Sequence, residues 1–212
     1  MDKKNSFLAL AALAVIIGMG SFIYRTQFAL PKSNPAPFET LGQEAAEETA
    51  KLLAGPGRVV VVTELIEVAR NPNLEAQVKA FKAGLAKHTG VTLKAAQELK
   101  RPPSEDPRVW PSAQAGQLAA FTEGADASVF FTSLPQQFTA ADIASLKGAK
   151  GKVVIVANQS PVLKPLLQQG IIHLAIVNRF PPKPAPSGKE TPRQWFDRVY
   201  LVAKSDALGE LP

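Results

Sequence analysis

The sequence contains no cysteine, and this absence excludes several kinds of site at once. Disulfides, thiolate nucleophiles, cysteine-ligated zinc or iron–sulfur centres, and a lipid anchor on an acylated cysteine all depend on that residue. Histidine is nearly absent too, with only His88 and His173 in 212 residues, so a histidine-rich metal site is not expected. We therefore predict a protein without a metal and without a cofactor.

A concentrated basic surface is also missing, although the formal net charge is +6, from 24 Lys and Arg against 18 Asp and Glu. The excess is spread along the chain. A nucleic-acid-binding protein usually gathers its positive charge on one face, with aromatic residues between the basic ones. The pattern therefore predicts a solvated basic surface and no nucleic-acid partner.

The common catalytic motifs do not occur. There is no G-x-G-x-x-G, P-loop or G-x-S-x-G pattern, and the glycines at 55 and 57 stand before the first predicted strand, on the wrong side for a phosphate loop. Glu64 and Glu67 could form a carboxylate pair, but a solvated loop is the simpler interpretation. We predict that the protein is not an enzyme and has no catalytic residues.

The first positive feature is a run of 19 residues without a charge, from Ser6 to Tyr24. As a helix this run would be about 28 Å long, close to the hydrocarbon thickness of a bilayer. Lys3 and Lys4 precede it, which favours an N-terminus in the cytoplasm. A cleaved signal peptide is the alternative, but its apolar region is normally shorter. We expect a single-pass anchor in the inner membrane, with the lipid bilayer as partner and the rest of the chain in the periplasm.

The composition divides the chain into an anchor over residues 1–25, a stalk with an amphipathic helix over residues 26–57, and an α/β domain over residues 58–212. Prolines after residue 30 favour an extended stalk. A helix is expected at residues 39–54, and two interpretations of it stay open. It packs against the domain, or it forms a short coiled segment between protomers.

In the predicted domain, β-branched runs alternate with amphipathic segments. The run RVVVVT at residues 58–63 is typical of a parallel strand buried on both faces, and KVVIVA at residues 152–157 repeats the pattern. Apolar residues recur at helical spacing over residues 74–89. Further strands are expected at residues 91–97, 127–132, 171–177 and 199–203. The alternation predicts an α/β fold, a doubly wound, mostly parallel sheet of five to six strands with helices on both faces.

Polar residues follow these strands. In open α/β sheets, ligands bind outside the carboxyl ends of the strands, near the point where strand order reverses. We predict a ligand-binding edge built from residues that end strands or begin helices: Thr63, Glu64, Asn71, Thr132, Ser133, Asn158, Gln159, Ser160, Asn178 and Arg179. Helix starts at this edge direct N–H groups toward it, which suits a polar small molecule or a carboxylate. Because Ser, Thr and Asn are also preferred helix caps, capping alone stays an open interpretation, for Asn158 and Ser160 in particular.

A proline-rich segment occupies residues 181–186 (PPKPAP). It is interpreted as a rigid connector, with a polyproline II ligand for a partner protein as the alternative. Trp195, Phe196 and Tyr200 follow it and are expected as core contacts beneath it.

The order of these elements resembles the N-terminal lobe of type I periplasmic sugar-binding proteins and the related ligand-binding region of transcription repressors. The resemblance covers residues 58–178 and rests on short motifs in a fixed order: VVVV at 59–62, Asn71-Pro72 before a helix that ends at Gly90, Ala125-Asp126-Ala127, and Gly151-Lys152-Val153-Val154. A flavodoxin-like fold fits the same order, but the acidic cluster of response regulators is missing.

The resemblance implies a solute-binding lobe whose ligand edge contains Asn71, Asn158 and the loop after Thr132. Only residues 178–212 follow the fifth strand, too few for a second lobe of equal size, so a single lobe is expected. The leading hypothesis is a non-catalytic, membrane-anchored extracytoplasmic binding module for a polar small molecule. The alternative is an accessory subunit of a larger membrane complex, with envelope proteins or a second copy of the chain as partners.

Overall fold

The structure, a computed structural model, describes residues 3–24, 34–65, 71–100, 114–156, 161–206, 208 and 211, with the side chains of residues 3–12 and 65 left aside. The chain divides into two compact units, Met1–Asn34 and Pro35–Pro212.

The first unit contains one helix, α1 (Lys3–Ile23), which includes most of the uncharged run. Among the residues that the structure describes, no helix combines the length and the apolar character needed to cross a membrane. The transmembrane anchor therefore stays a prediction from the sequence.

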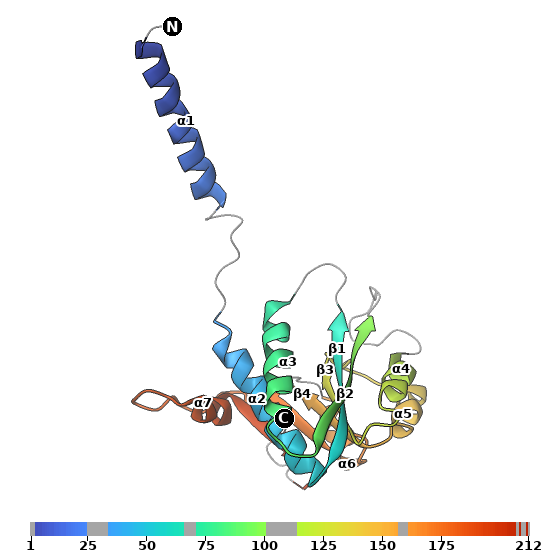
Figure 1. The fold of residues 1–212 in the computed structure, drawn as a ribbon. Helices are drawn as coiled ribbons and strands as arrows, with labels where there is room; N and C mark the ends of the chain where they lie inside the picture. Colours follow the sequence, from blue (N-terminus) through green and yellow to red (C-terminus); the bar gives the residue numbers. More distant parts are fainter. Residues whose placement is uncertain are drawn as a thin grey trace. The chain divides into compact units, whose positions relative to one another are not determined.

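The second unit alternates helices and strands (Figure 1). In chain order its elements are α2 (Ala36–Leu53), β1 (Gly57–Leu65), α3 (Pro72–Leu85), β2 (Val91–Lys100), α4 (Gln114–Phe121), β3 (Ala127–Phe131), α5 (Ala140–Lys147), β4 (Lys152–Val156), α6 (Leu163–Gln168), β5 (Leu174–Asn178), α7 (Pro192–Val199) and β6 (Tyr200–Lys204).

The strands form one six-stranded sheet in the order β2-β1-β3-β4-β5-β6. The first five strands of this order are parallel, and β6 runs antiparallel to β5. The predicted mostly parallel sheet of five to six strands is therefore confirmed, with six strands.

The four consecutive valines of β1 explain why the sheet has helices on both sides. Val59 and Val61 belong to one buried cluster, and Val60 and Val62 belong to the other, on the opposite face. All four are at most 2% exposed. Because side chains alternate along a strand, each face gains two fully buried valines, worth about 1.5–3 kcal/mol apiece.

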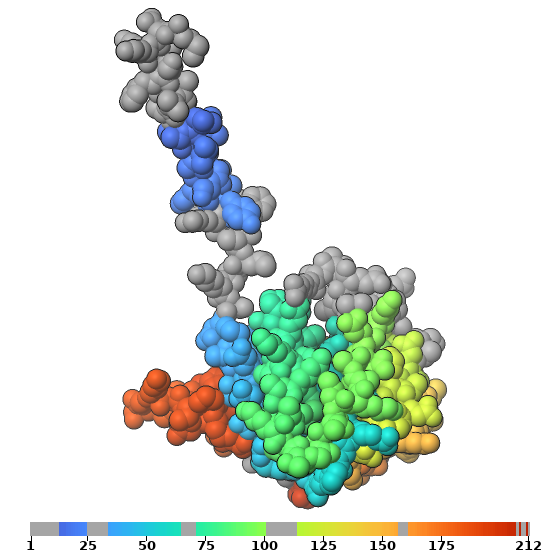
Figure 2. Space-filling view, viewed as in Figure 1, coloured from blue at the N-terminus to red at the C-terminus, as the bar shows by residue number. Residues whose placement is uncertain are grey.

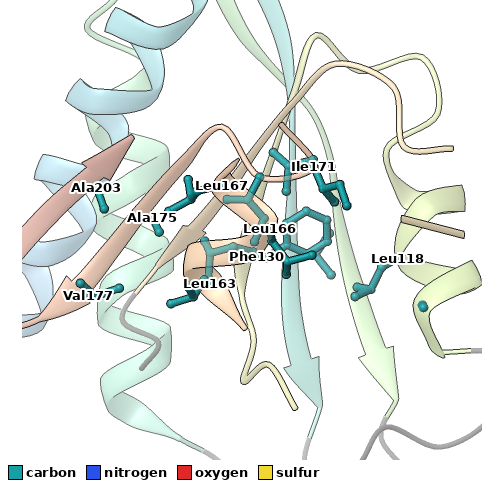
Figure 3. Close-up of a cluster of buried hydrophobic side chains, with 14 of the residues drawn as sticks. Leu118, Phe130, Leu163, Leu166, Leu167, Ile171, Ala175, Val177 and Ala203 are labelled. Carbon is teal, nitrogen blue, oxygen red and sulfur yellow. The ribbon is translucent and has the colours of Figure 1, made fainter. Parts of the chain in front are cut away.

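One face of the sheet is covered by α4, α5 and α6. In Figure 3 the leucines of α6 lie on one side of Phe130 of β3, and Leu118 of α4 lies on the other. A small apolar cavity of 20 Å³ lies in this cluster, lined by residues that include Phe130 and Leu166. It is too small for any ligand larger than one or two solvent-sized groups.

The opposite face is covered by α2, α3 and α7. The first two helices lie side by side (Figure 1), and their backbones approach so closely that a Cβ at Gly42 of α2 would stand 2.1 Å from the Gln77 carbonyl oxygen of α3. Of the two interpretations left open for α2, packing against the domain is therefore confirmed. The boundary expected at residue 58 falls inside the second unit, because Leu41 and Ala45 of α2 are fully buried in its core.

One helix was missed, and one strand boundary was predicted wrongly. The helix α7 was not predicted, because it follows a proline-rich segment and has few apolar residues. Thr191 caps it, with a capping box to Gln194, and Pro192 occupies its first turn. The strand β5 begins at Leu174 and not at Ile171, because the Ile171 and Ile172 N–H groups donate to the Leu166 carbonyl in the turn after α6.

Trp195, Phe196 and Tyr200, which were predicted to make core contacts, lie against one another. Phe196 is 1% exposed, and its ring stacks on Tyr200 at 5.4 Å between centroids. Trp195 meets Tyr200 edge to face at 5.6 Å. The prediction of core contacts is thus confirmed for Phe196, while Trp195 and Tyr200 are half-buried beside it.

Candidate binding site

Strand order reverses between β1 and β3. From β1 the chain proceeds to the outer strand β2 and then returns to β3, on the other side of β1. The helix after β1, α3, lies on one face of the sheet, and the helix after β3, α5, lies on the other. The two crossovers therefore diverge at the carboxyl ends of β1 and β3, which is where open α/β sheets bind ligands.

Glu64 and Ser133 meet at this point. The Ser133 backbone N–H donates a hydrogen bond of 3.1 Å to Oε2 of Glu64, which joins the two strands across 69 residues of sequence. Glu64 is half-buried, and Ser133 is exposed. Two of the predicted site residues are thus in direct contact at the reversal of strand order.

The threonines next to this pair also lie at the edge. Thr63 is half-buried, and its Oγ1 donates a long hydrogen bond of 3.4 Å to the Gln97 carbonyl of β2. Thr132 is 4% exposed and stands directly after β3. These two residues lie near the carboxyl ends of their strands at this edge, and Thr63 ties the edge to β2.

Asn71 caps a helix, which is one of the two interpretations that the sequence left open for the polar residues of this edge. It is the N-cap of α3, and its Oδ1 accepts hydrogen bonds of 3.1 and 3.2 Å from the backbone N–H groups of Asn73 and Leu74. Its side chain is exposed. The amide oxygen therefore serves the helix, so a ligand contact by Asn71 stays a prediction.

Asn178 and Arg179 lie at the same edge of the sheet but farther along it. They end β5, two strands from β3, and this corresponds to a lateral distance of about 10 Å. The Arg179 Nε donates 2.9 Å to the Tyr200 carbonyl, and its backbone N–H donates 2.7 Å to the Val199 carbonyl. The structure thus separates this pair from Glu64 and Ser133 and uses Arg179 to hold the start of β6.

Three predicted site residues, Asn158, Gln159 and Ser160, lie outside the described residues, so their contribution stays a prediction.

Both histidines make contacts of a structural kind. His88 Nε2 lies 3.2 Å from Oε2 of Glu47 and so links the end of α3 to α2. His173 Nδ1 accepts a hydrogen bond of 3.2 Å from the Val153 backbone N–H, between β5 and β4. Burial lowers the pKa of His173, and the Lys152 ammonium lowers it further, which favours the neutral ring that this bond requires. Over the described ranges no three metal-ligating side chains gather into a cluster.

Gln114 is a buried polar residue that was not predicted from the sequence. Gln114 begins α4 and is 2% exposed, and neither of its amide atoms has a hydrogen-bond partner within the described part of the chain. Helices of βαβ units begin near the carboxyl edge of the sheet, so Gln114 belongs to the same end of the domain as Glu64. Burial of an amide leaves no trace in a sequence, because glutamine is usually exposed.

The edge therefore offers the half-buried Glu64 carboxylate as an acceptor and the exposed residue Ser133, while the Thr132 side chain is buried beneath them. A carboxylate accepts hydrogen bonds at about four positions, and hydroxyl groups are suitable donors. The arrangement suits recognition of a small polyhydroxylated molecule.

No protein-family model matches the chain, and no curated protein matches it. Solved structures do match. An arabinose-binding protein from Geobacillus stearothermophilus is 17% identical, with a TM-score of 0.55, 82% of this chain covered and 63% of that chain. An ABC-transporter solute-binding protein from Burkholderia graminis, in complex with D-arabinose, is 18% identical, with a TM-score of 0.52 and coverages of 81% and 61%.

The chain has the fold of one lobe of sugar-binding proteins. A third match, a protein in the XylFII–LytSN complex, is 12% identical, with a TM-score of 0.50 and coverages of 80% and 60%. The chain spans less than two thirds of the length of each of these proteins. The resemblance stated from the sequence is confirmed for the fold of a single lobe.

Proposed function

We propose that the chain is a non-catalytic binding module that holds a small sugar-like molecule at the carboxyl edge between β1 and β3. The observation that carries the proposal is the Glu64–Ser133 contact at the reversal of strand order. A carboxylate fixed by a backbone N–H is pre-oriented, so it binds ligand hydroxyls without first losing side-chain freedom. The likeness to arabinose-binding structures supports a pentose or hexose as the ligand class.

The second unit, Pro35–Pro212, is suited to a direct test because it contains both hydrophobic clusters of the fold. Its thermal unfolding is measured against a panel of pentoses, hexoses and disaccharides. A ligand at about 100 times its Kd adds about 2.7 kcal/mol to the free energy of unfolding. We expect a shift for at least one sugar. Absence of any shift at millimolar concentrations contradicts the proposal.

The proposal includes attachment to the inner membrane from the periplasmic side. The uncharged run from Ser6 to Tyr24 supports it, as do eight large apolar side chains between Leu13 and Tyr24 that are 46–68% exposed. Such side chains are stable in lipid and costly in water. Alkaline extraction of membranes from cells that express the full chain tests this part. Release of the chain into the soluble fraction contradicts it.

The second candidate function is an accessory subunit of a larger envelope complex. It is favoured by one of the matched structures, the XylFII–LytSN complex, in which a protein of this fold is bound to a partner. A partner protein would then cover the edge that the second lobe covers in a two-lobed protein. Gentle detergent extraction of the full chain, followed by native electrophoresis and mass spectrometry, separates the two candidates. A monomer that binds a sugar supports the first and contradicts the second.

A further inference from the structure

A projecting loop carries the most exposed aromatic side chain among the described residues of the second unit. We name residues 179–191 the proline loop. It leaves the sheet after β5 and extends away from the helices (the orange-red projection beside α7 in Figures 1 and 2). Phe180 is 93% exposed, and residues 181–189 are all exposed. A phenylalanine ring left in water gives up the free energy of its burial, and this ring stands beside an exposed run of prolines and lysines.

The proline loop is held at both ends by hydrogen bonds to one short stretch of chain. The backbone N–H groups of Arg179 and Lys183 donate to the carbonyls of Val199 and Arg198, at 2.7 and 3.0 Å. At the far end, the Arg198 guanidinium donates two hydrogen bonds, of 2.7 and 3.0 Å, to the Glu190 carboxylate. Phe180 is therefore presented from a pre-organised backbone.

The segment from Arg179 to Arg198 has five cationic side chains and two carboxylates, a formal net charge of +3, which is half that of the whole chain. Both carboxylates are paired, Glu190 with Arg198 and Asp197 with Arg193. Lys183 and Lys189 are exposed, and in the described ranges neither ammonium lies within ion-pair distance of a carboxylate.

A shallow, open hollow lies between the proline loop and α7. Its volume is 280 Å³, and it is lined by Lys183, Pro184, Pro186, Gln194, Asp197 and Arg198. Its lining thus combines the Lys183 ammonium, the Arg198 guanidinium paired with Glu190, the Gln194 amide and the Asp197 carboxylate paired with Arg193. The space is large enough for a phosphate-bearing headgroup beside Lys183, and Phe180 stands three residues before that lysine.

We propose that the proline loop docks on an anionic lipid surface, with the Phe180 ring inserted among the headgroups and Lys183 and Lys189 against the lipid phosphates. Aromatic rings favour the membrane–water interface, and basic side chains are attracted to anionic lipids. A specific protein interface buries at least about 1,000 Å² around an apolar centre. The loop has one aromatic ring and short prolines, which suits a headgroup layer better than a protein pocket.

The test uses the unit Pro35–Pro212, so that α1 does not contribute. Its sedimentation is measured with vesicles of phosphatidylcholine alone and with vesicles that also contain phosphatidylglycerol. We expect binding only to the second kind, weakened by added salt. Phe180→Ala should weaken it about tenfold, and Lys183→Ala and Lys189→Ala about fivefold each.

Leu93→Ala is the matched control, because Leu93 of β2 is the other large apolar side chain of this unit that is exposed in the described ranges, at 39%. It should leave vesicle binding unchanged. All these substitutions are at exposed positions, so the thermal unfolding temperature verifies that each variant is folded. No binding, equal binding to both vesicles, or unchanged binding by Phe180→Ala overturns the proposal. If the variants lose only a protein partner from a detergent extract, the loop is a protein-docking site and the proposal is wrong.

Discussion

The carboxylate of Glu64 accepts a 3.1 Å hydrogen bond from the Ser133 backbone N–H, at the edge of the sheet where strand order reverses. A second bond of the same kind stands at the opposite edge of the same two strands, where Oδ2 of Asp126 accepts 2.8 Å from the Arg58 backbone N–H. The Glu64–Ser133 and Asp126–Arg58 hydrogen bonds can therefore be compared within one protein. Both bonds join β1 to β3, but only the first lies where a ligand is expected.

Replacing Glu64 with Gln tests this difference. The amide oxygen still accepts the Ser133 N–H, so the fold should be retained, but a charge-assisted bond to a ligand hydroxyl becomes a neutral one. A bond to a charged group contributes about 1.5–3 kcal/mol, against about 1 for a neutral pair, so we expect sugar affinity to fall about tenfold. Titration calorimetry of both proteins measures it.

Asp126→Asn is the control for that prediction. Its carboxyl has a lowered pKa because the Arg58 backbone N–H, and then the Arg58 guanidinium, hydrogen-bond to its charged form. Asparagine should weaken this link at the amino edge while sugar affinity stays unchanged. Equal losses of affinity in the two variants would mean that the effect comes from the strand pair and not from the site.

Asn71 allows capping and binding to be separated. Its Oδ1 accepts two backbone N–H groups of α3, so Asn71→Ala should lower the free energy of unfolding by about 1 kcal/mol. Asn71→Ser should restore most of that loss, because a serine hydroxyl also caps well. If serine restores stability but not sugar affinity, Asn71 contacts the ligand as well. Urea unfolding and calorimetry give the two values.

Much of this fold follows from patterns that are local in sequence. The valine run of β1, the Asn71-Pro72 start of α3 and the capping box at Thr139 each specify their element by short-range chemistry, and the structure contains all three. In contrast, α7 is only eight residues long, has one buried residue, Phe196, and follows a proline-rich segment, so this helix was not predicted. The capping box at Thr191 and the stacking of the Phe196 ring on Tyr200 of β6 both support it.

The candidate site was predictable only in part for a related reason. The edge itself follows from βαβ alternation, but which residues meet there depends on strand order. The Glu64–Ser133 contact joins residues 69 positions apart, and no local pattern specifies it. Strand order also separates Arg179 from Glu64 and Ser133, although the sequence predicted all three as residues of the same site.

The close approach of α2 and α3 predicts the effect of a methyl group. A Cβ at Gly42 would lie 2.1 Å from the Gln77 carbonyl oxygen, so the helices must separate, and Gly42→Ala should cost about 1–3 kcal/mol despite its better helix propensity. Gly116, within α4, has nothing within 4 Å of its added Cβ. Gly116→Ala should therefore stabilise the protein by about 0.5–1 kcal/mol. Thermal unfolding of both variants decides, and a Gly42→Ala variant as stable as the parent protein would contradict this view of α2–α3 packing.

Gln114 provides a test of buried polarity. Because its amide has no hydrogen-bond partner in the described part of the chain, Gln114→Leu should leave the free energy of unfolding unchanged or raise it by about 1 kcal/mol. Gln114→Ala should lower it by about 1–2 kcal/mol, since truncation leaves a void beside Leu118. A marked loss of stability in the leucine variant would mean that the amide is hydrogen-bonded in solution.

The pH dependence of stability should report on His173. In the folded chain the pKa of this ring is lowered, first by burial and then by Lys152, so at slightly acidic pH the unfolded chain binds more protons. The contribution of His173 is therefore fully present above its unfolded pKa of about 6.5 and is lost as the pH falls toward the lower folded value. His173→Gln keeps an acceptor for the Val153 N–H and removes the titration, so the fall in stability between pH 8 and pH 5.5 should become shallower. Urea unfolding across that range measures it, with His88→Gln as a variant that leaves His173 in place. An unchanged pH profile in His173→Gln would show that protonation of this ring does not oppose folding.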